Sequence, residues 1–301
     1  MVKESSHGHR IRQSTEDRVF GAVTYILATL FMLVCAYPLV YVLSASISNP
    51  ALIVSGKIIL LPKEIQFRAY EAVFKSEDVL LGYRNAVFYA FAGTAINIVL
   101  TTAGAYVLSR PDLWGRTVIT FLISFTMFFS GGMIPTYITI KNLGMINTVW
   151  AMLLPGAISA YNMMIVKNFF QGIPQELEES ANLDGCNDLG TLIRIVLPLS
   201  LPVLATFGLF YAVGHWNSYF SAMIYLTNDK MYPLQLILRN IIVTAESAAG
   251  DMSLMDPNFV EPPKQSIKMA VIVVATVPIM CVYPFLQKYF VKGVMVGALK
   301  G

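Results

Sequence analysis

Charged residues and cysteines are both scarce in this sequence. Asp, Glu, Lys and Arg make up 13% of the 301 residues, whereas a soluble globular domain carries about 25%. The cysteines are Cys35, Cys186 and Cys281, which show neither paired spacing nor the spacing of metal ligands. We therefore interpret them as small apolar residues and expect neither a disulfide framework nor a metal site. The net charge of +3 is too mild to indicate a nucleic-acid-binding surface.

The sequence also lacks the short motifs that bind nucleotides or carry catalysis. It contains no Gly-x-x-x-x-Gly-Lys-Ser/Thr phosphate-binding loop. It contains neither the Gly-x-Ser-x-Gly pattern of hydrolases nor the His-Glu-x-x-His pattern of zinc peptidases. We therefore expect no catalytic residues, and any ATP must be hydrolysed by another chain.

Hydrophobic residues, by contrast, make up 56% of the sequence and gather in six uncharged runs. The runs are Val19–Gly56, Asn85–Ser109, Thr117–Ile140, Asn142–Val166, Ile195–Asn228 and Met269–Gln287. Each supplies the roughly 20 apolar residues that cover a hydrocarbon layer about 30 Å thick. Because the backbone must satisfy its own hydrogen bonds in that layer, the runs predict helices. The expected fold is all-α, a polytopic membrane protein with about six transmembrane helices. A soluble helical protein would instead carry charged residues on one face of each helix.

The basic residues indicate how these spans are oriented. They are concentrated before the first span, after the last span and in the short connector between the second and third: Lys3, Arg10, Arg12, Arg18, Arg110, Arg116, Lys288, Lys292 and Lys300. The positive-inside rule places these segments, and hence both termini, in the cytoplasm. The first apolar run is too long for the core of a cleavable signal peptide, so we expect none.

No internal repeat divides the chain, so we predict a single membrane domain over 1–301. Its cytoplasmic parts would be the N-terminal segment 1–18, the loop 171–198 and the tail 288–301. Its extracytoplasmic parts would be the loops 48–84 and 229–268, the first of which contains one predicted short helix, Phe67–Phe74.

Glycine and proline interrupt two of the predicted spans. In the third span, Gly131-Gly132 and Pro135 should break the helical hydrogen bonds. Such a break is tolerated at membrane depth only where the backbone faces protein or a wet cavity, and we expect an outward-facing bend there. The fourth span carries Pro155-Gly156 near its middle, and Asn147 is placed to cap its start.

The loop 171–198 begins with a pattern typical of a short helix. Pro174 suits the first helical position, where its missing N–H is not needed. Glu176, Glu178 and Glu179 fall in the first turns, where the helix dipole favours negative charge. Gly185 supplies the permissive backbone that ends a helix.

A second short helix should follow in the same loop. Asn187 or Asp188 can cap its start, and it would run to Pro198. The sequence therefore predicts a helix–turn–helix that projects from the membrane, with Ser180 and Ala181 on an exposed face.

The order of residues in this loop resembles the EAA loop of ABC importer permeases. The matching stretches are Glu179-Ser180-Ala181, Asp184-Gly185 and Ile195-Val196-Leu197-Pro198, and the preceding Ile173–Leu177 is typical of the carbohydrate-uptake branch. The resemblance implies that the loop docks in a groove of the ATP-hydrolysing subunit through Glu179, Ser180, Ala181, Asp184 and Gly185. Glu179 would form an ion pair there. Ser180 and Cys186 stand where the family usually has Ala, but both are small, so docking is still expected.

The resemblance covers nearly the full length. The stretches Gly131–Tyr137, Leu143–Thr148, His215–Asn217 and Tyr289–Gly293 are similar to permeases that import large oligosaccharides, such as pectin and alginate fragments, including the second permease of an alginate importer. This implies a subunit of the bacterial inner membrane that contacts lipid and lines the pathway of an oligosaccharide. Its expected partners are a second permease, two ATPase subunits and an extracytoplasmic solute-binding protein. ATP and Mg would be bound by the ATPase, which leaves no cofactor on this chain.

A polar and aromatic run, His215–Tyr219, lies inside an otherwise apolar span. Trp216 and Tyr219 could stack on sugar rings while Asn217 bonds hydroxyl groups, since polar groups at membrane depth usually face a cavity or a partner. Alternatively, the aromatic residues belong to the interfacial belt and Asn217 joins two helices. His215 is more often a packing residue than a ligand. Further pathway candidates are Tyr161, Asn162 and Ser130.

Two other functions stay open from the sequence. The chain could import another solute, such as a peptide or an amino acid, although the carbohydrate-type loop argues for sugars. A membrane-embedded enzyme of glycan metabolism would need paired acids or a His/Asp cluster, and the uncharged runs contain no acid.

Overall fold

A computed structural model describes residues 14–253 and 264–298 of the chain. The α-helices are α1 (Thr15–Ser46), α2 (Pro50–Val54), α3 (Arg68–Lys75), α4 (Glu77–Ser109), α5 (Arg116–Phe125), α6 (Met133–Asn142), α7 (Trp150–Leu153), α8 (Ala160–Gln171), α9 (Gln175–Leu183), α10 (Asp188–Thr191), α11 (Leu197–Leu199), α12 (Leu201–Trp216), α13 (Tyr219–Tyr225), α14 (Leu234–Ser253) and α15 (Lys264–Ala298). A π-helical turn, Leu192–Val196, joins α10 to α11, and a 3-10 turn, Asp229–Met231, precedes α14. Every regular element in the described residues is a helix, which confirms the all-α prediction.

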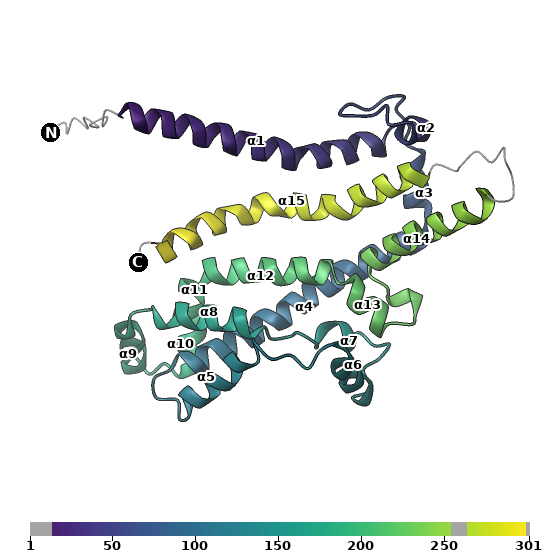
Figure 1. The fold of residues 1–301 in the computed structure, drawn as a ribbon. Helices are drawn as coiled ribbons and strands as arrows, with labels where there is room; N and C mark the ends of the chain where they lie inside the picture. The colour runs from purple at the N-terminus through teal and green to yellow at the C-terminus, as the bar shows by residue number, and fades with distance from the viewer. Residues whose placement is uncertain (1–13, 254–263, 299–301) are drawn as a thin grey trace.

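Four of the helices lie side by side in one bundle (Figure 1). α1 contacts α15, α15 contacts α12, and α12 contacts α4. α8 also packs on α4, and it contacts α5 and α12. α9 and α10 lie at the end of the bundle where α1 begins and α15 finishes, whereas α2, α3 and α13 lie at the opposite end (Figure 1). The basic residues Lys3, Arg10, Arg12 and Lys300 lie outside the described residues.

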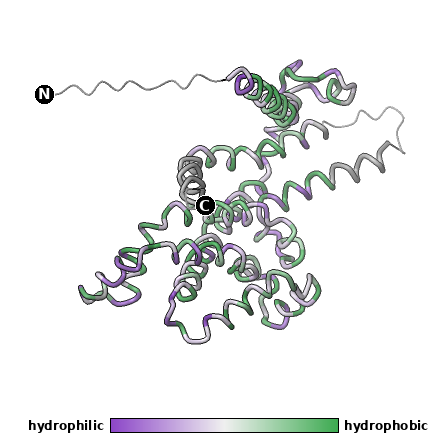
Figure 2. Tube along the Cα trace, turned by 60° about the vertical axis from the view of Figure 1, so that its left-hand side comes forward, coloured by the Kyte–Doolittle hydropathy of each residue, from purple (hydrophilic) through white to green (hydrophobic). Residues whose placement is uncertain are grey.

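Several of these helices are apolar enough for a membrane. In the described part of the chain, α1 and α4 are each long and apolar enough to cross a bilayer. The segments Asp188–Leu199 and Leu201–Trp216 form a third candidate that bends by 84°. Shorter apolar stretches occur in α5, α14 and α15. Hydrophilic residues gather in the connecting loops (Figure 2).

The third and fourth predicted spans are broken. In the third, α5 ends at Phe125 and α6 begins at Met133, so the predicted break around Gly131-Gly132 is confirmed. In the fourth, only the short α7 and then α8, which begins at Ala160, are helical. Gly156 lies between them with a φ of +83°, which residues with a side chain rarely adopt.

The two predicted outer loops contain more helix than the sequence indicated. The predicted helix Phe67–Phe74 is confirmed as α3, Arg68–Lys75. α4 already begins at Glu77, ahead of its predicted start at Asn85, because acidic residues stabilise the first turn of a helix beyond the apolar run. α14 was missed altogether. Its apolar residues are buried by contact with α4 and α15, so tertiary packing rather than local pattern stabilises it.

Asn147 does not cap the fourth span, so that prediction is wrong. Its Oδ1 accepts hydrogen bonds from the backbone N–H groups of Thr227 at 3.0 Å and Asn228 at 2.9 Å. Its own N–H donates to the carbonyl of Tyr225 at 2.8 Å. Asn147 thus ties the turn after α6 to the segment after α13, a contact between segments far apart in the sequence.

α4 is the central helix of the bundle. It contributes residues to three separate hydrophobic clusters, among them Ala86, Tyr89 and Ala105. Small residues on α4 let neighbouring helices approach closely. Three of the hydrophobic clusters in the described residues are therefore organised around this helix.

Candidate functional site

The predicted helix–turn–helix of the loop 171–198 is present. Its first helix, α9, ends in a turn at Gly185, whose φ is +79°. The N–H of Cys186 donates to the carbonyl of Ala181 at 2.9 Å, and the N–H of Asp184 donates to the carbonyl of Ser180 at 3.0 Å. The first of these bonds, reaching back five residues across a left-handed glycine, is the pattern of a Schellman motif. Asp184 takes part in this turn through its backbone N–H, and its side chain is exposed.

The second helix of the loop is capped by Asn187 rather than by Asp188. Its Oδ1 accepts a hydrogen bond from the N–H of Gly190 at 2.8 Å. The helical path then continues from α10 through the π-helical turn to α11. Asn187 and Gly185 together fix the angle at which the chain reverses.

The exposed face of α9 differs from the predicted one at a single position. Glu176, Glu179, Ser180 and Leu183 are spaced along one side of the helix and all are exposed. Leu183 is 91% exposed, which is unusual for a large apolar side chain. Ala181 is only 7% exposed, so its prediction as an exposed residue is wrong. Its side of the helix is turned toward the rest of the chain. We call Glu176, Glu179, Ser180 and Leu183 the loop face.

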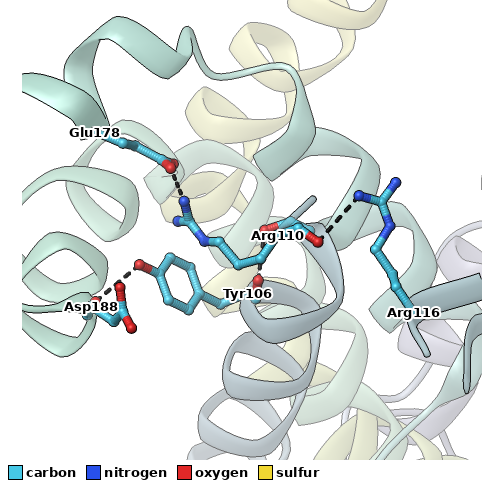
Figure 3. Close-up of polar contacts among 6 residues, drawn as sticks. Tyr106, Arg110, Arg116, Glu178 and Asp188 are labelled. Atoms are coloured by element: carbon cyan, nitrogen blue, oxygen red, sulfur yellow. Dashed lines mark hydrogen bonds and ion pairs between the residues drawn. The ribbon is translucent and has the colours of Figure 1, made fainter. Parts of the chain in front are cut away.

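The opposite side of the loop is anchored to the end of α4 (Figure 3). Glu178 forms an ion pair with Arg110, and these side chains are only 16% and 22% exposed. The Arg110 guanidinium lies 4.0 Å from the centre of the Tyr106 ring. The Tyr106 hydroxyl donates to the backbone carbonyl of Asp188 at 3.0 Å. The last turn of α4 and its C-cap residue Arg110 therefore hold both helices of the loop.

Sequence reasoning missed this anchor. It assigned Arg110 and Arg116 only to the positive-inside rule, whereas Arg110 holds the loop and Arg116 donates through Nη1 to the Arg110 carbonyl at 3.2 Å. A signal was available, because Tyr106 and Arg110 are four residues apart and so share one side of a helix. Their partner could not be identified without the tertiary structure.

Two side chains of the run His215–Tyr219 make contacts with other helices inside the bundle. Trp216 is 7% exposed, and its Nε1 donates to the carbonyl of Ala275 in α15 at 3.2 Å. Its ring meets the ring of Tyr83 edge-on at 5.8 Å. The Nε2 of His215 lies 2.6 Å from the Oδ1 of Asn97 in α4. Both side chains join helices of this chain, so Trp216 lies in neither of the two settings that the sequence left open.

The other pathway candidates are more accessible. Asn217 is exposed at the end of α12, where its Nδ2 donates to the Val213 carbonyl of its own helix at 3.0 Å, so it does not join two helices here. Tyr161 and Tyr219 are exposed, and Asn162 is half-buried near the start of α8. Ser130 is exposed between α5 and α6, and its Oγ accepts from the N–H of Gly132 at 3.2 Å. These residues remain predictions for the pathway.

A groove of about 560 Å³ lies between α4, α12 and α15. It is lined by apolar and aromatic side chains such as Phe91, Leu209 and Ile279, so it offers sugar hydroxyls few hydrogen-bond partners. In the described part of the chain no three His, Cys, Asp or Glu residues come together as metal ligands.

Comparison with known proteins gives consistent matches over almost the whole chain. The family model of binding-protein-dependent transport system inner membrane components matches residues 8–296. The polygalacturonan/rhamnogalacturonan transport system permease protein YtcP of Bacillus subtilis is 47% identical over 95% of this chain and 100% of its own length. Protein LplC of the same organism is 42% identical over 97% of this chain and 99% of its own.

A solved structure is similar as well. A chain from the crystal structure of a bacterial ABC transporter, described as importing the acidic polysaccharide alginate, is 36% identical to this chain. It superimposes with a TM-score of 0.84, covering 93% of this chain and 99% of the other.

Proposed function

The chain belongs to the family of inner-membrane components of binding-protein-dependent transport systems, and on that basis we propose that it forms part of the pathway through which an acidic oligosaccharide enters the cell. It is a permease subunit of an ABC importer and a multi-pass protein of the inner membrane. The observation that carries the mechanism is the anchored loop at one end of α4.

The loop face is the part of the chain that would dock on an ATPase subunit. Glu179 and Ser180 are exposed on it, and Leu183 presents an apolar side chain that this chain leaves uncovered. Ala181 and Gly185 would support docking indirectly, because Ala181 lies on the packed side of α9 and Gly185 sets the turn. Asp184 is exposed beside that turn. ATP and Mg would be bound and used on that partner, since the sequence has no phosphate-binding loop.

The anchor would transmit movement of the ATPase into the membrane. Glu178 and Tyr106 fasten the two helices of the loop to the same turn of α4, so a displacement of the loop acts directly on that helix. α4 runs the length of the bundle and contacts α8, α12 and α14. Movement of α4 would therefore reach the residues that remain proposed for the pathway: Ser130, Tyr161, Asn162, Asn217 and Tyr219.

The positive-inside rule supports one orientation for this arrangement. The end of the bundle that carries α9, α10 and the start of α1 would face the cytoplasm and the ATPase. The opposite end would face the solute-binding protein. A second permease would complete the pathway, as the family's binding-protein-dependent importers require.

The names of the relatives support an acidic oligosaccharide as the substrate. One relative is named for polygalacturonan and rhamnogalacturonan, and the solved neighbour for alginate. All three polysaccharides carry carboxylates. Ser218, inside the run of pathway candidates, is uncharged and would not repel such groups.

The transport test uses the complete importer in proteoliposomes, with its second permease, ATPase and binding protein. We expect uptake of galacturonate oligosaccharides that depends on ATP, and no comparable uptake of neutral malto-oligosaccharides. Equal uptake of both, or uptake of amino acids or peptides instead, would overturn the proposed substrate class.

The docking test compares two neighbouring glutamates. Glu179→Ala should weaken co-purification of the ATPase without changing the melting temperature of the isolated chain, because Glu179 is exposed. Glu178→Ala should lower the melting temperature, because it removes the partner of Arg110. If Glu179→Ala binds the ATPase as well as the wild type does, Glu179 is not part of the docking surface.

A further inference from the structure

The break in the fourth span leaves backbone carbonyls without helical partners. The chain between α7 and α8 is not helical, so the carbonyls of Gly156 and Ala157 must be satisfied in another way. The Nδ2 of Asn97 donates to both, at 2.9 Å and 2.8 Å. Asn97 lies on α4 and is 1% exposed. A buried amide of the central helix therefore holds the break.

These contacts fix the orientation of the Asn97 amide. Its two N–H groups serve the two carbonyls, which leaves Oδ1 to accept from the Nε2 of His215 at 2.6 Å. The reversed amide would place its oxygen against two carbonyl oxygens, which is unfavourable. His215 must consequently carry its proton on Nε2.

His215 packs against α4 at a glycine, Gly93. A Cβ at Gly93 would lie 2.3 Å from the His215 Nε2, so only glycine leaves room for the ring. About one turn away, Thr101 and Tyr211 join the same two helices through their hydroxyl groups at 2.8 Å. The polar contacts thus bind α4 and α12 together where the fourth span bends.

We propose that Asn97 and His215 are positioning residues for transport, holding the fixed point about which α8 pivots; we call them the pivot pair. This inference rests on the proposed function. α8 begins directly after the break, and at its other end it leads into the loop 171–198. A movement of the loop would then swing α8 about the pivot pair. Tyr161 and Asn162, in the first turn of α8, would change their exposure to the pathway.

The experiment measures sugar transported per ATP hydrolysed by the complete importer in proteoliposomes. Asn97→Leu and His215→Leu should lower this ratio about three- to tenfold, the range for losing interhelical hydrogen bonds in a membrane bundle. The ATPase should still co-purify, because the loop and its anchor are untouched. His215→Gln should keep a ratio near wild type, since its amide can still donate to Asn97 Oδ1. Gly93→Ala should resemble His215→Leu by displacing the ring.

A second measurement separates this inference from the identity of the sugar. In a cysteine-free background, spin labels are placed at Phe91→Cys in α4 and Ile158→Cys in the break, both exposed. The distance distribution should be narrow in the assembled wild-type importer and broad with Asn97→Leu. If this holds while no acidic sugar is taken up, the proposed substrate fails and the pivot pair stands. Unchanged distances and transport ratios in Asn97→Leu, or equal damage by His215→Gln and His215→Leu, would overturn the pivot pair.

Discussion

α1 and α4 are almost equal in length and both are apolar, yet they relate to the rest of the chain in opposite ways. α1 spans 32 residues and α4 spans 33. The most apolar window of α1 is not buried at all by this chain, whereas a third of that of α4 is buried. Buried residues of α1 are confined to Ser44–Ser46 at its end, while those of α4 run from Val79 to Leu108.

The difference in burial between the two helices follows from polar and small residues and not from overall hydrophobicity. α4 is the less hydrophobic of the two, but Asn97, Thr101, Tyr106 and Gly93 give it close contacts and hydrogen bonds at several levels. In lipid, helices gain little from apolar contact alone, so such residues decide which helix is central. The more hydrophobic of the two helices is therefore the less integrated one. Three experiments test this comparison.

The largest effect is expected at the end of α4 that holds the loop. Arg110→Ala leaves Glu178 without its partner, which costs about 2–3 kcal/mol, the lower part of the range for buried ion pairs, because both side chains keep some exposure. The melting temperature of the isolated chain and co-purification of the ATPase should both fall.

Arg84→Ala is the matched control, because Arg84 lies in α4, whose C-terminal end Arg110 caps, and is exposed. The double exchange Arg110→Glu with Glu178→Arg should recover part of the loss. Equal melting temperatures for Arg110→Ala and Arg84→Ala would show that the anchor adds nothing to stability.

An intermediate effect is expected at the turn of the loop. Gly185→Ala forces a side chain into the left-handed region, which costs about 1–2 kcal/mol. Gly21→Ala in α1 is the control, because a Cβ added at either glycine would meet no atom within 4 Å and only Gly185 has a positive φ. ATPase co-purification should drop for Gly185→Ala and stay unchanged for Gly21→Ala. A drop of similar size in both would show that backbone conformation is not the cause.

The smallest effect is expected on α1. Phe31 is 72% exposed, so Phe31→Ala should change the unfolding free energy of the isolated chain by less than about 0.5 kcal/mol. On α4, Tyr89→Phe removes only the hydroxyl that donates to the Met231 carbonyl at 2.9 Å, yet it should cost about 0.5–1.5 kcal/mol. Thermal melts in one detergent compare the two. If the loss of the whole ring on α1 costs more, α1 is better integrated than its exposure indicates.

The loop shows how far sequence could predict the site. Local signals sufficed for α9 and its end at Gly185, and they narrowed the second cap to Asn187 or Asp188, because capping and turn geometry depend on neighbouring residues. They did not suffice for Ala181, whose burial depends on what lies beneath α9. Glu178 and Glu179 are adjacent and chemically identical, and only the position of Arg110 distinguishes them.

Several features could be predicted from the sequence alone: the chain is helical and apolar, its third span breaks around Gly131-Gly132, and the loop 171–198 resembles an EAA loop. These properties follow from composition and local spacing, since in a bilayer each helix satisfies its own backbone. Three other features follow from how the helices pack: α14 is a helix, Trp216 and His215 join helices, and Asn97 holds the carbonyls of the broken span. They could not be predicted because these contacts join residues distant in sequence, and their geometry depends on how closely whole helices approach.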